Sequence, residues 1–165
     1  MKWLMMTALS IALTLGPARA EEQALFSIQL LTPKTALRAA TAALEKCRAE
    51  GFQVAVAVVD RMGLLQVMLR DRYAGAHTPE TARRKAWTAT SFRTNTTDML
   101  EITGPGQPQA GVRQVTDALM IGGGMVIEAG GSLVGAIGVS GAPGGELDDL
   151  CAAAGIAAIE DDIAF

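Results

Sequence analysis

Few residues in this chain can take part in metal or redox chemistry. Its 165 residues include one histidine, two cysteines and two tryptophans, and aromatic residues make up 4% of the sequence. A four-coordinate zinc site needs several His, Cys or carboxylate ligands together. A metal site built from histidine alone within one chain is therefore excluded, and each remaining candidate residue can be weighed singly.

Charge is also scarce. Charged residues make up 19% of the chain and hydrophobic residues 50%, with a formal net charge of −3. This composition excludes a disordered chain and a nucleic-acid-binding chain with a basic stripe. The length suits one ordinary domain and is too short for two domains with separate cores. The 18 glycines indicate tight turns and close backbone contacts around a core of Ala, Val and Leu.

The first 20 residues have the three parts of a secretory signal peptide. Lys2 supplies a positive charge, residues 4–15 are apolar, and residues 18–20 (Ala-Arg-Ala) form a small-residue cleavage site. A helix that crosses a bilayer needs about 20 apolar residues, so this run is short for a span. An uncleaved anchor or a buried N-terminal helix is the alternative. We expect one mature domain over residues 21–165, periplasmic or secreted, with no membrane span after cleavage.

The first half of the mature chain predicts a helix followed by a hairpin. Thr32-Pro33 is typical of a helix start, and Gly51 of a helix end. Spacings of three and four put the apolar helical face on Leu37, Ala40, Leu44 and Cys47. Residues 52–59 (FQVAVAVV) predict a strand buried on both faces, and residues 64–69 a second strand. The short connection makes the two strands an antiparallel hairpin.

The second half predicts helical segments on either side of a second hairpin. Thr78-Pro79 opens a helix that ends near Phe92, and a short helix follows around residues 97–102. Three glycines at 122–124 precede the second hairpin, whose last strand covers residues 133–139. The final helix carries one apolar face, formed by Leu147, Cys151, Ala154 and Ala158. Helices do not alternate regularly with strands, so we predict an α+β fold with an antiparallel sheet, or a three-layer variant of it.

Several of these segments resemble the GlcG/HbpS family, which includes the C-terminal domain of PduO-type adenosyltransferases. The resemblance covers about residues 31–159. It rests on residues 56–60 (VAVVD), 84–89 (RKAWTA), the three glycines at 122–124, and above all residues 134–141 (VGAIGVSG). It implies a profilin-like fold, in which N- and C-terminal helices and a central helical segment cover the sheet. It also implies homo-oligomers and haem binding.

Two residues in the loop before the central helix are candidate haem ligands. Many members of the family carry Arg-Met-Asp-Gly after the second strand, whereas this chain has a longer loop over residues 69–77. His77, the only histidine, ends that loop, and a neutral imidazole is a good axial ligand for haem iron. Tyr73, the only tyrosine, offers a phenolate ligand. The alternatives are an exposed loop histidine and a tyrosine whose hydroxyl binds the backbone.

Basic residues provide candidate partners for a ligand carboxylate such as a haem propionate. Lys85, within the KAWTA stretch, is the first choice, and Arg61 and Arg70 at the ends of the first hairpin are the second. The alternative for the run at 83–85 is a solvated basic face. The three glycines match neither the dinucleotide fingerprint nor the P-loop, so nucleotide binding is not expected. Gly135 and Gly138 instead suggest a close backbone approach within a strand.

The two cysteines and one serine complete the set of reactive candidates. In a profilin-like arrangement the first and last helices lie side by side, so a Cys47–Cys151 disulfide is one interpretation; two separate buried thiols are the other. An exported compartment permits disulfides. Ser140 lacks the G-x-S-x-G elbow of hydrolases, so it supports that chemistry only weakly.

The leading functional hypothesis is an exported haem-binding protein, without turnover of its own, that serves haem or iron uptake, storage or sensing. A binding module for a small organic acid or another tetrapyrrole is the first alternative. Haem degradation and a purely structural oligomer are the others. A homo-oligomer with a small-molecule ligand, and no nucleic acid, is the expected set of partners.

Overall fold

The computed structural model describes residues 24–164. The predicted signal peptide, residues 1–20, lies outside this range. Within residues 24–164, no helix combines the length and the apolar character that a membrane span requires.

Four antiparallel strands form one sheet in the order β2-β1-β4-β3. Both predicted hairpins are confirmed, and so is the short helix after α2. The elements are α1 (Pro33–Ala49), β1 (Ala55–Asp60), β2 (Leu65–Arg70), α2 (Thr78–Phe92), α3 (Thr96–Ile102), the 3₁₀-helix η1 (Ala110–Gln114), β3 (Gly124–Ala129), β4 (Ser132–Ser140), α4 (Gly145–Ala157) and α5 (Glu160–Ile163).

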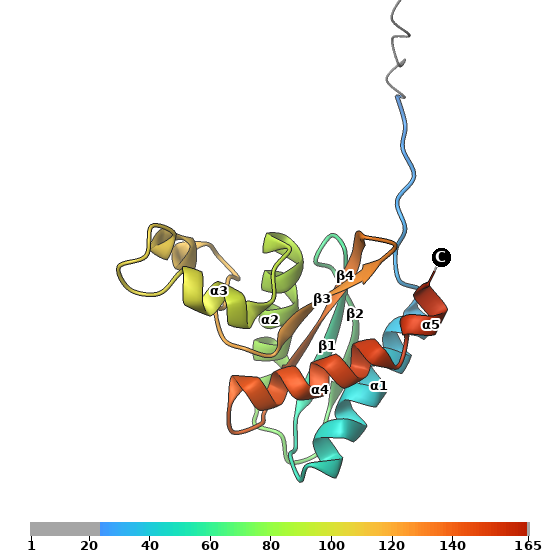
Figure 1. Ribbon diagram of the computed structural model, residues 1–165. Coiled ribbons are helices and arrows are strands. Elements are labelled where there is room, and N and C mark those ends of the chain that lie inside the picture. Colours follow the sequence, from blue (N-terminus) through green and yellow to red (C-terminus); the bar gives the residue numbers. More distant parts are fainter. Residues whose placement is uncertain (1–23, 165) are drawn as a thin grey trace, which may run out of the picture.

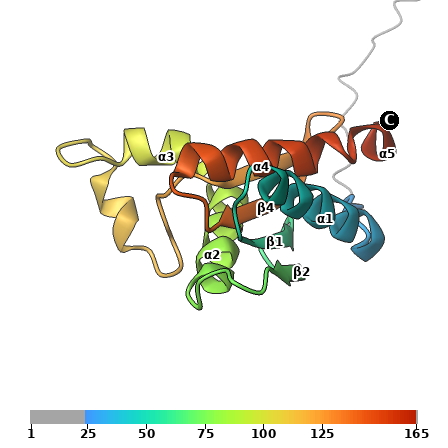
Figure 2. The same cartoon turned by 90° about the horizontal axis from the view of Figure 1, so that it is seen from below.

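The molecule has three layers, with the sheet in the middle (Figure 1). Helices α1 and α4 cover one face, and α2 covers the other, as the view from below makes clear (Figure 2). This is the predicted α+β, profilin-like arrangement. The two terminal helices share a face and the central helical segment lies opposite them.

The two faces of β1 differ in side-chain size, and this difference sets how close each helix lies. Val56 and Val58 pack into the large core beneath α1 and α4. Ala55 and Ala57 instead face α2, where they pack with Ala82. A Cβ added to Gly138 on β4 would lie 2.1 Å from the carbonyl oxygen of Ala82. Small residues on both surfaces therefore let α2 approach the sheet closely, as predicted for Gly138.

The buried faces of α1 and α4 differ in part from the prediction. Leu37 is 47% exposed, and the buried stripe of α1 runs through Ala36, Ala39, Ala40, Ala43, Leu44 and Cys47. In α4 the stripe is Asp148, Cys151, Ala152 and Gly155. A Cβ on Gly155 would lie 2.7 Å from the Ala39 carbonyl oxygen. The two helices touch through small residues. The prediction that Leu147 lies on the buried face, which rested on hydrophobicity alone, is therefore wrong.

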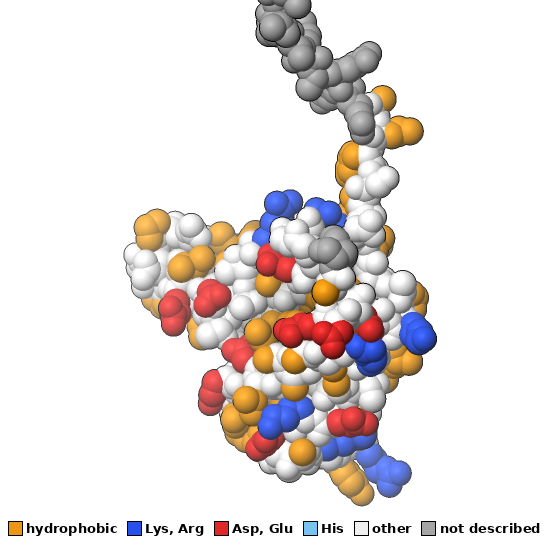
Figure 3. Space-filling model, turned by 45° about the vertical axis from the view of Figure 1, so that its right-hand side comes forward, with side chains coloured by type: hydrophobic (Ala, Val, Ile, Leu, Met, Phe, Trp, Pro, Cys, Tyr) orange, Lys and Arg blue, Asp and Glu red, His pale blue; other side chains and the backbone are white. Residues whose placement is uncertain are grey.

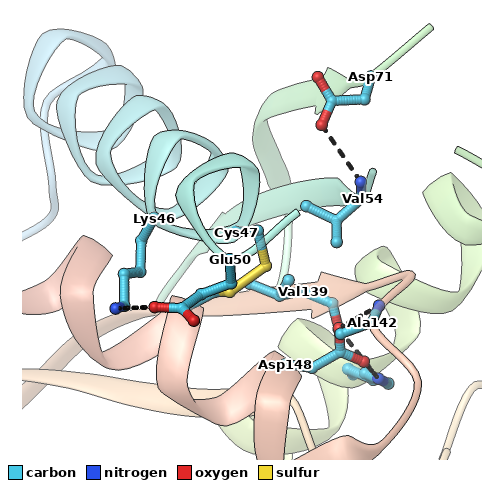
Figure 4. Close-up of a disulfide and its surroundings, with 10 residues drawn as sticks. Lys46, Cys47, Glu50, Val54, Asp71, Val139, Ala142 and Asp148 are labelled. Carbon is cyan, nitrogen blue, oxygen red and sulfur yellow. Dashed lines mark hydrogen bonds and ion pairs between the residues drawn. A yellow bond between two sulfur atoms is a disulfide. The ribbon is translucent and has the colours of Figure 1, made fainter. Parts of the chain in front are cut away.

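Cys47 and Cys151 form a disulfide, which decides between the two interpretations of the sequence. It joins the last turn of α1 to α4 across 104 residues of sequence, with Cα atoms 5.5 Å apart. Figure 4 shows the bond and the side chains around it. Both cysteines are fully buried, so the disulfide crosses the core on this side of the sheet.

The segment between α2 and β3 forms a lobe that projects from the sheet (Figures 1 and 2). Met99, Ala118 and Met120 form its small core, against which Trp87 and Phe92 of α2 also pack. The Thr97 hydroxyl donates to Asp149 of α4, which also accepts a hydrogen bond from the Gly123 amide. These contacts attach the lobe to both helical layers.

Candidate functional site

A pocket of about 630 Å³ opens at the end of the sheet where β1 begins and β4 ends. Its walls come from five parts of the chain: residues 51–53 after α1, the loop before α2 together with the first turns of α2, Ile121 before β3, residues 140–145 from the end of β4 to the start of α4, and Asp148 of α4. Three of the predicted site residues, Tyr73, His77 and Lys85, line this pocket. The fourth, Arg61, lies elsewhere.

His77 stands at the rim, at the start of α2. It occupies the N-cap position, one residue before the predicted cap, and its side chain makes no capping hydrogen bond. Thr78 does not cap the helix: its hydroxyl donates to the Gly75 carbonyl at 2.8 Å. A Cβ on Gly75 would lie 2.7 Å from the imidazole Cε1. Glycine at this position therefore leaves room for the ring, which is exposed to solvent and to the pocket.

Tyr73 is 79% exposed at the same rim. Within residues 24–164 its hydroxyl does not form the backbone hydrogen bond that the alternative interpretation of a loop anchor requires. Asp71, two residues earlier, holds the loop in its place. It is 3% exposed and accepts hydrogen bonds from Arg48 at 2.7 Å and from the Val54 amide at 3.2 Å.

Lys85 forms the floor of the pocket and is 1% exposed. Its ammonium donates to the Val139 carbonyl at 2.9 Å and to Asp148 Oδ2 at 2.7 Å. The other oxygen of Asp148 accepts from the Ala142 amide at 3.0 Å (Figure 4). The alternative interpretation of a solvated basic face is therefore wrong for Lys85, which already has a carboxylate partner within the chain.

Burial raises the pKa of Asp148, an effect that the attraction of Lys85 opposes only in part. A lysine ammonium has three hydrogens, and two of those on Lys85 are used. The floor of the pocket thus combines one remaining donor with a carboxyl group whose pKa burial has raised. A ligand meets a pair with little net charge.

The middle one of the three consecutive glycines, Gly123, makes room for this pair. Gly123 has φ of 111°, in the region that favours glycine. A Cβ there would lie 2.8 Å from the Lys85 Nζ and 2.6 Å from the Asp148 Cβ. No side chain other than hydrogen fits between β3 and the buried pair.

The other basic residues of α2, Arg83 and Arg84, bind acidic side chains and backbone carbonyls of the protein itself. Arg83 pairs with Glu80 at 2.7 Å and with Asp117 at 2.8 Å. The hydrogen bond from Arg83 lowers the pKa of Glu80, and the two carboxylates raise the pKa of Arg83. Arg84 donates to the carbonyls of Asp117 and Ala118 at the base of the lobe.

Two further candidates do not form the chemistry considered from the sequence. Arg70 donates to the Ala74 carbonyl and helps to shape the loop. Ser140 lines the same pocket as His77, but no hydrogen bond joins the two side chains. Ser140 and His77 therefore do not form the hydrogen-bonded pair that activates a serine for nucleophilic attack. Within residues 24–164, no three His, Cys, Asp or Glu side chains are grouped so that they could hold a metal ion.

A family model described as "haem degrading protein HbpS-like" matches residues 31–157. The chain belongs to the HbpS-like family. This confirms the resemblance found in the GAIGVSG segment and its surroundings.

Solved HbpS-like structures agree with this assignment. A double mutant of HbpS from Streptomyces reticuli is 38% identical, with a TM-score of 0.77, over 86% of this chain and 95% of that one. The protein ORFY of Klebsiella pneumoniae is 26% identical, with a TM-score of 0.81, over 84% and 97% of the two chains. A structure described as a PduOC–haem complex is 30% identical, with a TM-score of 0.74, over 79% and 95%.

One curated relative is the corrinoid adenosyltransferase PduO of Salmonella typhimurium. It is 32% identical over 102 residues, which is 61% of this chain. The match spans 30% of the length of that enzyme. The likeness therefore concerns one part of PduO.

Asp148 is the residue of this HbpS-like site that the sequence analysis missed. It lies three residues before Cys151, on the buried stripe of α4. An acid at a buried helical position needs a partner. That signal was available in the sequence, but the partner, Lys85, is 63 residues away.

Proposed function

We propose that this HbpS-like protein binds haem in the pocket at the start of α2, with His77 as the iron ligand. The observation that carries the proposal is the convergence of His77, Tyr73 and Lys85 on one pocket of about 630 Å³. Pockets that bind small molecules and cofactors usually have volumes of about 300–1,000 Å³. The haem complex of the PduOC relative supports the same ligand class.

The residues of the pocket fit the parts of a haem molecule. The imidazole of His77 makes no capping hydrogen bond to α2, so it is available to iron. Tyr73, also at the rim, offers its phenolate oxygen as a second candidate ligand. A propionate would accept from the third hydrogen of Lys85, and its negative charge would raise the pKa of the nearby Asp148 further. Bound haem would supply iron redox and gas-binding chemistry; the protein would hold and orient it.

A titration with haemin tests this proposal. We expect a saturable Soret shift at one haemin per chain. His77→Ala should change the Soret position and weaken binding, while Tyr73→Phe tests the phenol oxygen as the alternative ligand. Absence of a saturable shift would refute haem binding. An unchanged spectrum in His77→Ala together with a changed one in Tyr73→Phe would move the ligand to the tyrosine.

A second candidate is a corrinoid or another tetrapyrrole bound without ligation by His77. The likeness to part of PduO, a corrinoid adenosyltransferase, favours it. Hydroxocobalamin titrated in parallel with haemin separates the two, because the preferred ligand gives the larger rise in Tm.

We also propose that the protein is exported, forms homo-oligomers, and serves haem or iron uptake, storage or sensing. The signal-like segment and the disulfide support export, since disulfides persist in oxidising compartments. Intact mass after expression in a bacterial host should correspond to cleavage after Ala20, with the protein in the periplasmic fraction. A full-length mass in the cytoplasmic fraction would contradict export.

A further inference from the structure

A second pocket, of about 430 Å³, lies at the opposite end of the sheet. Arg61, Arg93 and Thr90 are among its polar lining residues, and Phe26, Ile28 and Leu133 are among its apolar ones. It shares no lining residue with the pocket of His77. We infer that this second pocket binds an organic carboxylate that carries an apolar chain.

Two guanidinium groups supply the positive charge. Arg61 directly follows β1 and Arg93 directly follows α2. Within residues 24–164, neither side chain forms a hydrogen bond or an ion pair, whereas Arg38, Arg48 and Arg83 are all paired with acids. Figure 3 shows basic side chains gathered where the N-terminal segment leaves the molecule, the end at which β1 and α2 finish (Figure 1). A guanidinium binds a carboxylate through two parallel hydrogen bonds.

The backbone at Arg93 adds an independent argument. Its φ is 53°, the left-handed conformation that glycine usually adopts after the last helical turn. A residue with a side chain is strained there. The chain has arginine at a position where glycine would end the helix at lower cost, and such strain concentrates at functional positions.

Thr90 contributes a buried hydroxyl that lacks a partner. The residue is 4% exposed and lines the pocket, and its Oγ1 has no hydrogen-bond partner. Buried hydroxyls are normally paired, because leaving one unpaired is costly. A carboxylate oxygen held by the two arginines would accept this hydrogen bond.

The apolar wall defines the rest of the ligand. Phe26 is 86% exposed and Ile28 is 37% exposed in the extended N-terminal segment. A short aliphatic or aromatic chain attached to the carboxylate would cover part of this surface and gain from its burial. A small inorganic anion would leave it open to water.

Hexanoate, 1-hexanol and acetate test the two halves of this ligand separately. The exported protein is titrated with each by calorimetry, and amide chemical shifts locate the binding. We expect hexanoate to bind at least about tenfold more tightly than either of the others, since each lacks one half of the interaction. Shifts should concentrate at residues 61–62 and 90–93. Equal binding of all three, or hexanoate shifts confined to residues 73–85, would overturn the inference.

Variants separate loss of the site from loss of the fold. Arg61→Gln and Arg93→Gly should each weaken hexanoate binding about tenfold, while Arg93→Gly also relieves backbone strain and keeps or raises Tm. Thr90→Val should weaken binding without lowering Tm, because the hydroxyl has no partner in the free protein. Arg72→Gln, an exposed arginine outside this pocket, is the control. Wild-type affinity in Arg61→Gln and Arg93→Gly would refute the site, whatever the haemin titration gives.

Discussion

The two ends of the sheet differ in whether their basic side chains are paired with an acid. Helix α2 and strands β1 and β4 each run from one pocket to the other. At the His77 end, the cation Lys85 is buried and its charge is balanced by Asp148. At the Arg61 end, the guanidiniums have no acidic partner within residues 24–164.

The difference indicates two kinds of ligand. A pocket whose charges are balanced within the chain suits a large, mainly apolar ligand. No unpaired charge then has to lose its water when the ligand enters. A pocket with two unpaired guanidiniums favours an anion. The first end is also held by the disulfide, since Cys151 lies one helical turn from Asp148.

Removing the disulfide should have the largest effect. Cys47→Ala with Cys151→Ala opens a cross-link that spans 104 residues. In the chain-entropy model a loop of about 100 residues is worth about 4.7 kcal/mol, less any relief of native strain. Urea unfolding should show this loss in the free energy of unfolding.

The disulfide variant also tests the comparison of the two ends. Amide hydrogen exchange should accelerate more at residues 51–53 and 144–148 than at residues 61–63 and 90–93, because only the first set adjoins the cross-link. Equal acceleration at both ends would show that the cross-link stabilises the fold as a whole and has no special role at the His77 pocket.

The second largest effect is expected for Lys85→Met. Removing one partner of a buried ion pair costs about 3–5 kcal/mol, and we expect the lower value because Asp148 can take up a proton. Lys46→Met is the matched control. Lys46 pairs with Glu50 at the surface, where the loss should stay below about 1 kcal/mol.

The pH dependence of Lys85→Met has a definite sign. Burial already raises the pKa of Asp148, and loss of the ammonium should raise that pKa further. A carboxyl group with a raised folded-state pKa is best tolerated when it is protonated. The defect should therefore be small below the unfolded value near 3.8 and grow as the pH rises through the folded value. A defect that stays constant from pH 4 to pH 8 would show that Asp148 does not titrate in this range.

The sequence predicted the fold better than the site. The fold followed from local signals in the sequence. The valines and alanines of residues 52–59 predicted a strand, and Thr32-Pro33 predicted the start of a helix. Both elements are present, and so are the two predicted hairpins. Lys85 was identified, but its environment was not, because its acid lies on another helix. Arg61 and His77 were considered for one ligand but line different pockets, because Arg61 lies in the turn of the first hairpin and His77 follows its second strand.

The smallest effect we predict compares one glycine from each end. Gly63 at the Arg61 end and Gly51 at the His77 end have φ of 80° and 86°, so alanine is strained at both by about 1–2 kcal/mol. A Cβ at Gly51 meets nothing within 4 Å, whereas one at Gly63 would lie 2.9 Å from Trp87 Cδ1. Gly63→Ala should therefore lower the free energy of unfolding more than Gly51→Ala. It should also alter Trp87 fluorescence and, through the adjacent β1–β2 turn, weaken hexanoate binding, while haemin binding stays unchanged. If both variants lose equal stability, Trp87 moves aside freely and the turn does not fix the second pocket.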